Sequence, residues 1–136
     1  MVLLVSFMVL FPNGLKAECD DSIETIETMI VKEAIKQGIS VDLALAVARV
    51  ESNFNPKAKG TKGEIGLYQI MPYHTKLNLW DVKTNIKFGI YLLKQFSIKC
   101  ADMGNYWVIC FNNGVNRRPK YPNLHPYYQR ILWALK

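Results

Sequence analysis

The sequence has few of the residues that bind metal ions. It contains three cysteines without a Cys-x-x-Cys pair, and its two histidines, His74 and His125, stand alone and far apart. Protein metal sites usually gather several such ligands at short spacing. We therefore expect neither a metal nor another cofactor, and we expect both histidines to lie at the surface or in loops.

Long apolar segments are also missing. The apolar run over residues 2–11 is ten residues long, whereas a helix that spans a bilayer needs about 20. Pro12, Gly14 and the small residue Ala17 follow this run, and that order is typical of a secretory signal peptide. We predict a signal peptide over residues 1–17 and export of the chain. An uncleaved membrane anchor is the alternative.

Strand-like alternation of Val and Thr is hard to find, which argues against an all-β fold. The chain has 136 residues, half of them apolar, and neither a repeat nor a linker divides it. One domain over residues 18–136 is therefore expected. Apolar residues at three- and four-residue steps predict a mostly α domain, with an irregular or β-like turn near residues 57–72. The expected helices cover residues 20–38, 41–54, 80–100, 105–114 and 127–136.

Several details of these helices follow from local rules. Asp21 is expected to cap the first helix and Ser40 the second, because short polar side chains accept from the free N–H groups of a first turn. Gly89 in the third helix predicts a close contact with another helix, since a mid-helix glycine is otherwise unfavourable. The last helix is expected to face the core with Tyr128, Ile131, Leu132 and Leu135.

The net charge of +6 suits an anionic polymer such as cell wall or nucleic acid, without choosing between them. The basic cluster over residues 116–120 has the character of a solvated loop, so nucleic-acid binding is not expected. For the cysteines, one disulfide and one free thiol are predicted. Cys19 with Cys100 and Cys100 with Cys110 are both open as pairs.

One carboxylate stands in an unusual place. Glu51 follows Val50 near the end of a helix in which only Arg49 is polar from Leu43 onward. Desolvation and the negative end of the helix dipole both raise the pKa of such a carboxyl. A carboxylic acid that stays protonated near neutral pH can serve as a general acid for a glycosidic oxygen. The alternative is an ordinary solvated glutamate at a helix end.

Five segments, in order and at workable spacing, bear on this choice. They are LALAVARVESNFNPKA, GEIGLYQIMP, NIKFGIYLLKQF, CFNNG and YYQRI. Over residues 39–132 the chain resembles the lytic transglycosylases, whose fold is related to goose-type lysozyme. The resemblance implies a single compact lysozyme-like domain. It places Glu51 at the catalytic position and implies substrate contacts by Ser52, Gly66, Tyr68, Gln69, Tyr91, Phe111, Asn112 and Tyr127.

The resemblance also implies an activity. A lytic transglycosylase would cleave peptidoglycan between N-acetylmuramic acid and N-acetylglucosamine and leave 1,6-anhydromuramic ends. It would act as a monomer in the periplasm or outside the cell, beside a secretion, conjugation or phage envelope-penetration apparatus. A hydrolytic lysozyme of the same fold and a non-catalytic glycan-binding component are the alternatives.

Two departures from the family pattern bear on these alternatives. Phe111 stands where the family has a tyrosine, so that hydroxyl is missing from the site. Glu64 stands where the family usually has alanine, and it faces the expected cleft. A second carboxylate is what ordinary glycosidases use, so Glu64 is the residue that would favour hydrolysis.

Overall fold

The computed structural model describes residues 25–136. The predicted signal peptide, Cys19 and Asp21 lie outside these residues. The described part is mostly helical and holds no strand, as predicted for a lysozyme-like domain. Its α-helices are α1 (Ile26–Gln37), α2 (Val41–Ser52), α3 (Val82–Lys99), α4 (Ile109–Asn113) and α5 (Pro126–Ala134), and its 3-10 turns are η1 (Pro72–His74), η2 (Ala101–Tyr106) and η3 (Pro122–Leu124).

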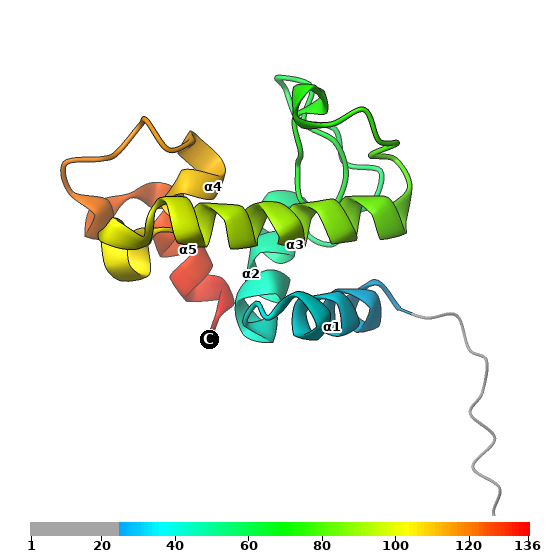
Figure 1. The fold of residues 1–136 in the computed structure, drawn as a ribbon, viewed down its shortest axis with the longest axis horizontal. Coiled ribbons are helices and arrows are strands. Elements are labelled where there is room, and N and C mark those ends of the chain that lie inside the picture. Colours follow the sequence, from blue (N-terminus) through cyan, green and yellow to red (C-terminus); the bar gives the residue numbers. More distant parts are fainter. Residues whose placement is uncertain (1–24) are drawn as a thin grey trace, which may run out of the picture.

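The long helix α3 runs through the middle of the molecule (Figure 1). The segment over residues 57–80 stands above its N-terminal end, whereas α4 lies near its C-terminal end. Helix α1 packs against α2 and α3, and α2 also packs against α5. The C-terminal end of α2 contacts both the turn, through Ser52 and Leu67 O, and α5, through Glu51 and Tyr127.

Helix α2 begins and ends for local reasons. The Ser40 side chain accepts from Leu43 N at 3.3 Å, which confirms the predicted cap. The helix ends at Ser52, before the predicted boundary, because Asn53 adopts a left-handed conformation with φ 51°. In α1 the predicted cap is wrong: the helix begins at Ile26, and Thr25 caps it by accepting from Thr28 N.

The inward face of α3 carries Ile86, Ile90 and Leu93, all buried as their spacing predicted. Gly89 lies on the same face, but its close neighbour is the ring of Tyr68 rather than another helix. A Cβ at this position would collide with that ring. The glycine thus lets the 57–72 turn pack directly on the helix.

Helix α5 turns a different face inward from the one its sequence predicted. Tyr127 and Ile131 are buried, whereas Leu132 and Leu135 are exposed. Tyr127 was predicted as a substrate contact rather than as part of the inward stripe. Its ring, 1% exposed, fills the space between α5 and α2 and sets the rotation of the helix.

The turn over residues 57–72 has isolated antiparallel bridges, from Lys59 to Ile65 and from Ile65 to Ile70, in agreement with the β-like turn that was predicted. Asn85, on α3, is buried and holds this turn. Its amide donates to Ile65 O and Leu79 O at 2.9 Å each, and its oxygen accepts from Tyr68 N at 3.0 Å. Gly66 has φ +73° and approaches the Asn85 amide so closely that a side chain would not fit.

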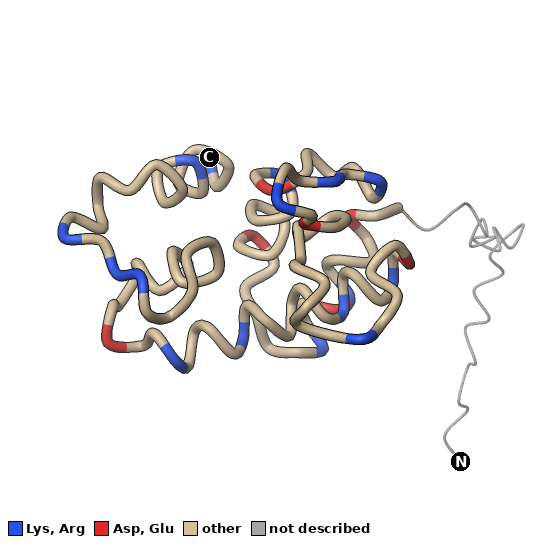
Figure 2. Tube along the Cα trace, turned by 90° about the horizontal axis from the view of Figure 1, so that it is seen from above, with Lys and Arg blue, Asp and Glu red and all other residues tan. Residues whose placement is uncertain are grey.

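Cys100 and Cys110 form a disulfide, which is the second of the two pairings that the sequence left open. The bond closes the η2 turn between α3 and α4, and a loop of this length stabilises a fold by roughly 2–3 kcal/mol. No helix within residues 25–136 is long and apolar enough to cross a membrane. Lys and Arg positions are spread along the trace rather than gathered in one segment (Figure 2).

Candidate active site

The site begins with the last turn of α2, which presents Glu51. The preceding turn of this helix is packed in the core through Val47 and Ala48. Glu51 itself is partly buried, since α5 covers one side of it. The helix therefore holds a carboxyl group at the border between the core and solvent, and rigid packing beneath it leaves little freedom of position.

Tyr127 supplies the direct partner of this carboxyl. Its hydroxyl donates to Oε1 of Glu51 at 2.8 Å. Burial raises the pKa of Tyr127 well above its ordinary value of 10, and the Glu51 charge adds to that rise. Tyr127 is therefore always a donor, and Oε1 is its acceptor. When the carboxyl is protonated, its proton lies on Oε2, the oxygen that Tyr127 leaves free.

Burial raises the pKa of Glu51 from 4.5 to about 7. The hydrogen bond from Tyr127 and the charge of Arg130 oppose this rise, while the charge of Glu64 adds to it. The group is therefore close to half protonated at neutral pH. Such a pKa lets one carboxyl give up a proton and take one back within a single turnover.

Glu64 enters the site through its charge. Its Oε2 accepts from the backbone N of Lys62 at 2.9 Å, so the side chain is held within its own turn. Its charge raises the pKa of Glu51, so the two carboxyls are close enough to interact, and the position of Glu64 on the cleft stays a prediction. Gly60 lies directly beside Glu64 and Gln69, so a Cβ there would displace the ends of both side chains.

Ser52 and Gln69 have structural roles that their sequence motifs did not reveal. The Ser52 hydroxyl lies 2.9 Å from Leu67 O and 3.1 Å from Ala48 O, so it joins α2 to the turn. The Gln69 amide donates to Gly66 O at 2.9 Å and to Ala58 O at 3.3 Å. Of the Gln69 amide only the side-chain oxygen remains for a substrate. The Ser52 hydroxyl uses its proton within the protein and could only accept from a sugar, so its predicted sugar contact stays a prediction.

Three of the predicted substrate-binding rings pack inside the protein. Tyr68 is fully buried and donates to Ala44 O at 3.0 Å, and Tyr127 is buried in the same way. Phe111 is partly buried, with its ring centroid 6.5 Å from that of Tyr68 and 6.1 Å from that of Phe96. The expectation that Tyr68 and Tyr127 offer flat faces to sugars is therefore wrong. Tyr68 supports the turn, and Tyr127 acts on Glu51.

Tyr91 and Asn112 are the predicted contacts that stay accessible. Tyr91 is 45% exposed and stacks on Phe88 with centroids 5.7 Å apart. Asn112, on α4, is exposed. No hydrogen bond joins either side chain to Glu51 within residues 25–136. They can reach a ligand, whereas the internal contacts of the site are made by Tyr127, Ser52 and the turn.

These features can be compared with those of known families. The family model of the transglycosylase SLT domain matches residues 28–126. The chain belongs to this family. No solved structure matches the chain. Membership supports lytic transglycosylase-type activity in general terms and implies peptidoglycan as the substrate.

Two residues that contact or orient this candidate site were not predicted from the sequence. Asn85 was visible as the single polar residue on the inward face of α3, and it orients the turn that carries Gln69. Arg130 had no signal, because an exposed arginine on a helix has the pattern of an ordinary surface residue. Its guanidinium lies 5.6 Å from the centroid of the Tyr127 ring. Its charge also acts on Glu51.

Within residues 25–136 no group of three or more His, Cys, Asp or Glu side chains comes together as a metal site would require. The chemistry that the arrangement offers is proton transfer at one carboxyl. Tyr127 and Arg130 both favour its ionised form, while burial favours its neutral form. Because these effects partly cancel, the pKa of Glu51 stays near neutral pH, and both its protonated and its ionised form are accessible there.

Proposed function

We propose that this protein cleaves the β-1,4 bond between N-acetylmuramic acid and N-acetylglucosamine and forms 1,6-anhydromuramic ends. The observation that carries the proposal is the Glu51 carboxyl, partly buried at the end of α2, with a pKa of about 7 and one oxygen held by Tyr127. Glu51 is the catalytic residue. Tyr91, Asn112 and the Gln69 oxygen are the side chains proposed to contact the glycan.

In the first step the proton on Oε2 of Glu51 passes to the glycosidic oxygen, and the bond from that oxygen to C1 of the muramic acid breaks. The electron pair of the bond leaves with the N-acetylglucosamine oxygen, which becomes a hydroxyl. The acetamido group of the muramic acid stabilises the positive charge that develops at C1. Tyr127 and Arg130 stabilise the new Glu51 carboxylate.

In the second step the Glu51 carboxylate accepts the proton of the C6 hydroxyl of the muramic acid. The C6 oxygen forms a bond to C1, closes the anhydro ring and consumes no water. Because this nucleophile belongs to the same sugar, it has a high effective concentration at C1. The acid is regenerated at the end of the turnover, which is the exchange that a pKa near 7 supports.

Hydrolysis is the second candidate, and Glu64 favours it. Ordinary glycosidases place a second carboxylate across the cleft to activate water or to attack the sugar. The charge of Glu64 acts on Glu51, so the two carboxyls share one electrostatic environment. A water molecule activated on that side would give a reducing end in place of the anhydro ring.

The products decide between these reactions. Purified sacculi are digested with the wild-type protein, and the soluble fragments are analysed by mass spectrometry. Transglycosylation predicts anhydromuramic ends, each lighter than a reducing end by one water. Reducing ends alone would show hydrolysis. Glu51→Gln is expected to release no fragments while it still folds, and a variant that kept full biological effect would show a non-catalytic glycan-binding role.

We also propose that the chain is exported to the periplasm or the cell exterior, where its substrate lies. The Cys100–Cys110 disulfide supports this, because such bonds persist in oxidising compartments. Cell fractionation followed by N-terminal sequencing tests it: a mature chain that begins near residue 18 would show a cleaved signal peptide, and an intact N-terminus in the membrane fraction would show an anchor. Association with a secretion, conjugation or phage apparatus stays a prediction.

A further inference from the structure

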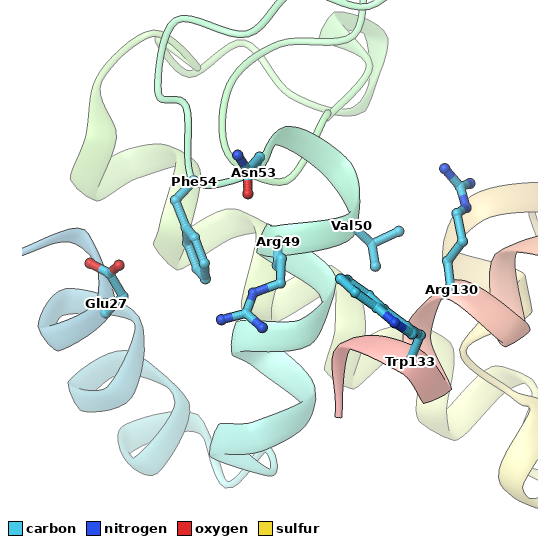
Figure 3. A pocket seen from close by; sticks show the side chains of 7 residues that line it. All are labelled: Glu27, Arg49, Val50, Asn53, Phe54, Arg130 and Trp133. Carbon is cyan, nitrogen blue, oxygen red and sulfur yellow. The ribbon is translucent and has the colours of Figure 1, made fainter. Parts of the chain in front are cut away.

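Both groups that favour the ionised form of Glu51 come from α5. The Tyr127 hydroxyl donates to Oε1 of Glu51, and Arg130 follows about one turn later on the same helix. Figure 3 shows Arg130 on α5 and Val50, the neighbour of Glu51, on α2, where both line the same hollow. The placement of α5 beside the end of α2 therefore decides the environment of the carboxyl.

The start of α5 is the part of this helix that has to be held. Tyr127 is its second residue, because the helix begins at Pro126. The N–H groups of a first turn have no partner within their own helix. Pro126 has no N–H, so the N–H of Tyr127 is the first donor of α5 that needs an acceptor. Tyr127 is 1% exposed, and a buried N–H without an acceptor is costly.

His125 supplies that acceptor. Its Nδ1 accepts from Tyr127 N at 3.3 Å, so the imidazole ring caps the helix in the place of the more usual Ser, Thr, Asp or Asn. The backbone of His125 is fixed on both sides: its N donates to Pro122 O at 3.2 Å, and its O accepts from Gln129 N at 3.0 Å. The N–H that this ring holds belongs to the same residue whose hydroxyl holds Glu51.

The other side of the His125 ring reaches α4. Its Nε2 lies 3.1 Å from the side-chain nitrogen of Asn113. A neutral ring that accepts through Nδ1 carries its proton on Nε2, so it donates to Asn113 when that amide turns its oxygen to the ring. Asn113 directly follows Asn112, which is proposed to contact the glycan. His125 thus joins the helix that would meet the substrate to the helix that orients the acid.

We propose that His125 is a positioning residue for the reaction: its ring holds the first turn of α5 against α4 and thereby keeps the Tyr127 hydroxyl on Oε1 of Glu51. His125 acts through Tyr127 and touches no reacting atom. This inference rests on the proposed function for the role of Glu51 in catalysis.

The pKa of Glu51 reports the position of the Tyr127 hydroxyl without any substrate. It is measured by a pH titration in the NMR spectrometer, on protein with isotope-labelled glutamate carboxyl carbons. In His125→Ala the hydroxyl is held less firmly, so the pKa of Glu51 should rise by roughly half a pH unit. Tyr127→Phe, which removes the hydroxyl altogether, should raise it further. Each variant is checked for folding by thermal melting.

Three further variants separate the cap from other effects. His125→Asn is as uncharged as the alanine variant but introduces a preferred cap residue, so the pKa of Glu51 should return close to its wild-type value. Thr25→Ala is the matched control, since it removes the cap of α1, and it should lower stability without moving this pKa. His125→Gln fills the space of the ring without capping and should behave like His125→Ala, which it replaces if the alanine variant is unfolded.

Several results would overturn the proposal. They are an unchanged pKa of Glu51 in His125→Ala, an equal rise in Thr25→Ala, and no recovery in His125→Asn. A double variant gives the strictest test. With Tyr127→Phe already present, His125→Ala should produce no additional rise, because its effect passes through that hydroxyl. A full additional rise would also overturn the proposal.

Activity provides the second arm. Release of fragments from sacculi should fall in His125→Ala through kcat rather than KM, and it should recover in His125→Asn. Unchanged kcat in His125→Ala would count against the proposal. A wild type that releases no fragments, while the pKa of Glu51 responds to these variants as expected, would instead sink the proposed function. The two failures are therefore distinguishable.

Discussion

The hydroxyl of Tyr127 lies 2.8 Å from Oε1 of Glu51, across 76 positions of sequence. This contact joins the end of α2 to the first turn of α5. It orients the carboxyl so that its second oxygen is free, and it stabilises the anion that forms after proton transfer. Tyr127 is therefore a positioning residue for Glu51, and its ring is at the same time part of the core.

Replacing Tyr127 tests this relationship. Tyr127→Phe removes the donor that favours the ionised form, so the pKa of Glu51 should rise above about 7. The decline of kcat/KM at high pH should then move to higher pH, and the maximal rate should fall roughly 10- to 100-fold. Tyr68→Phe is the matched control, since its hydroxyl contacts only Ala44 O. It should lower stability and leave the pH profile in place.

Removing the Glu64 charge should act in the opposite direction. Glu64 raises the pKa of Glu51, so Glu64→Gln should lower that pKa and move the decline in kcat/KM to lower pH. Asp42→Asn, at the start of the same helix, is the control and should leave the decline where it is. A pH profile of Glu64→Gln that matches the wild type would show that the two carboxyls do not interact.

The raised pKa of Glu51 also makes stability depend on pH. Between pH 4.5 and about 7 the folded protein keeps a proton that the unfolded chain loses. The wild type is therefore destabilised as pH rises through this window. Glu51→Gln removes the effect and should be more stable than the wild type at pH 8, by about 3 kcal/mol if the whole shift is expressed, with little difference at pH 4.

Urea unfolding at both pH values measures this difference. Ser97→Ala is a control that does not titrate, and its difference from the wild type should be the same at pH 4 and pH 8. A gain in Glu51→Gln that is equal at the two pH values would contradict the raised pKa.

Gly89→Ala tests the contact between α3 and the turn. An exposed helix position would gain about 1 kcal/mol from this change. Here the new methyl group collides with the Tyr68 ring, so we expect a loss of roughly 1–3 kcal/mol in the free energy of unfolding. Made in a Tyr68→Leu background, the same change should lose much less, because the ring is gone. A similar loss in both backgrounds would mean that another neighbour is responsible.

The sequence and the structure agree where local rules apply. The spacing of Ile86, Ile90 and Leu93 predicted the inward face of α3, and Ser40 predicted the start of α2. They disagree where a distant segment intervenes. Tyr68 and Tyr127 read as cleft rings beside family motifs, yet both fill the core. Neither the helical spacing of residues nor the order of motifs shows whether a distant segment of the chain buries an aromatic ring.

The sequence by itself determined the helices, the apolar end of α2 and the carboxyl placed on it, because these depend on neighbours within a few residues. Tertiary structure alone decided that Tyr127 reaches Glu51, that Asn85 holds the turn and that Arg130 lies over the ring of Tyr127. Those contacts join segments far apart in the chain. Their distances depend on how whole helices pack, which no local pattern records.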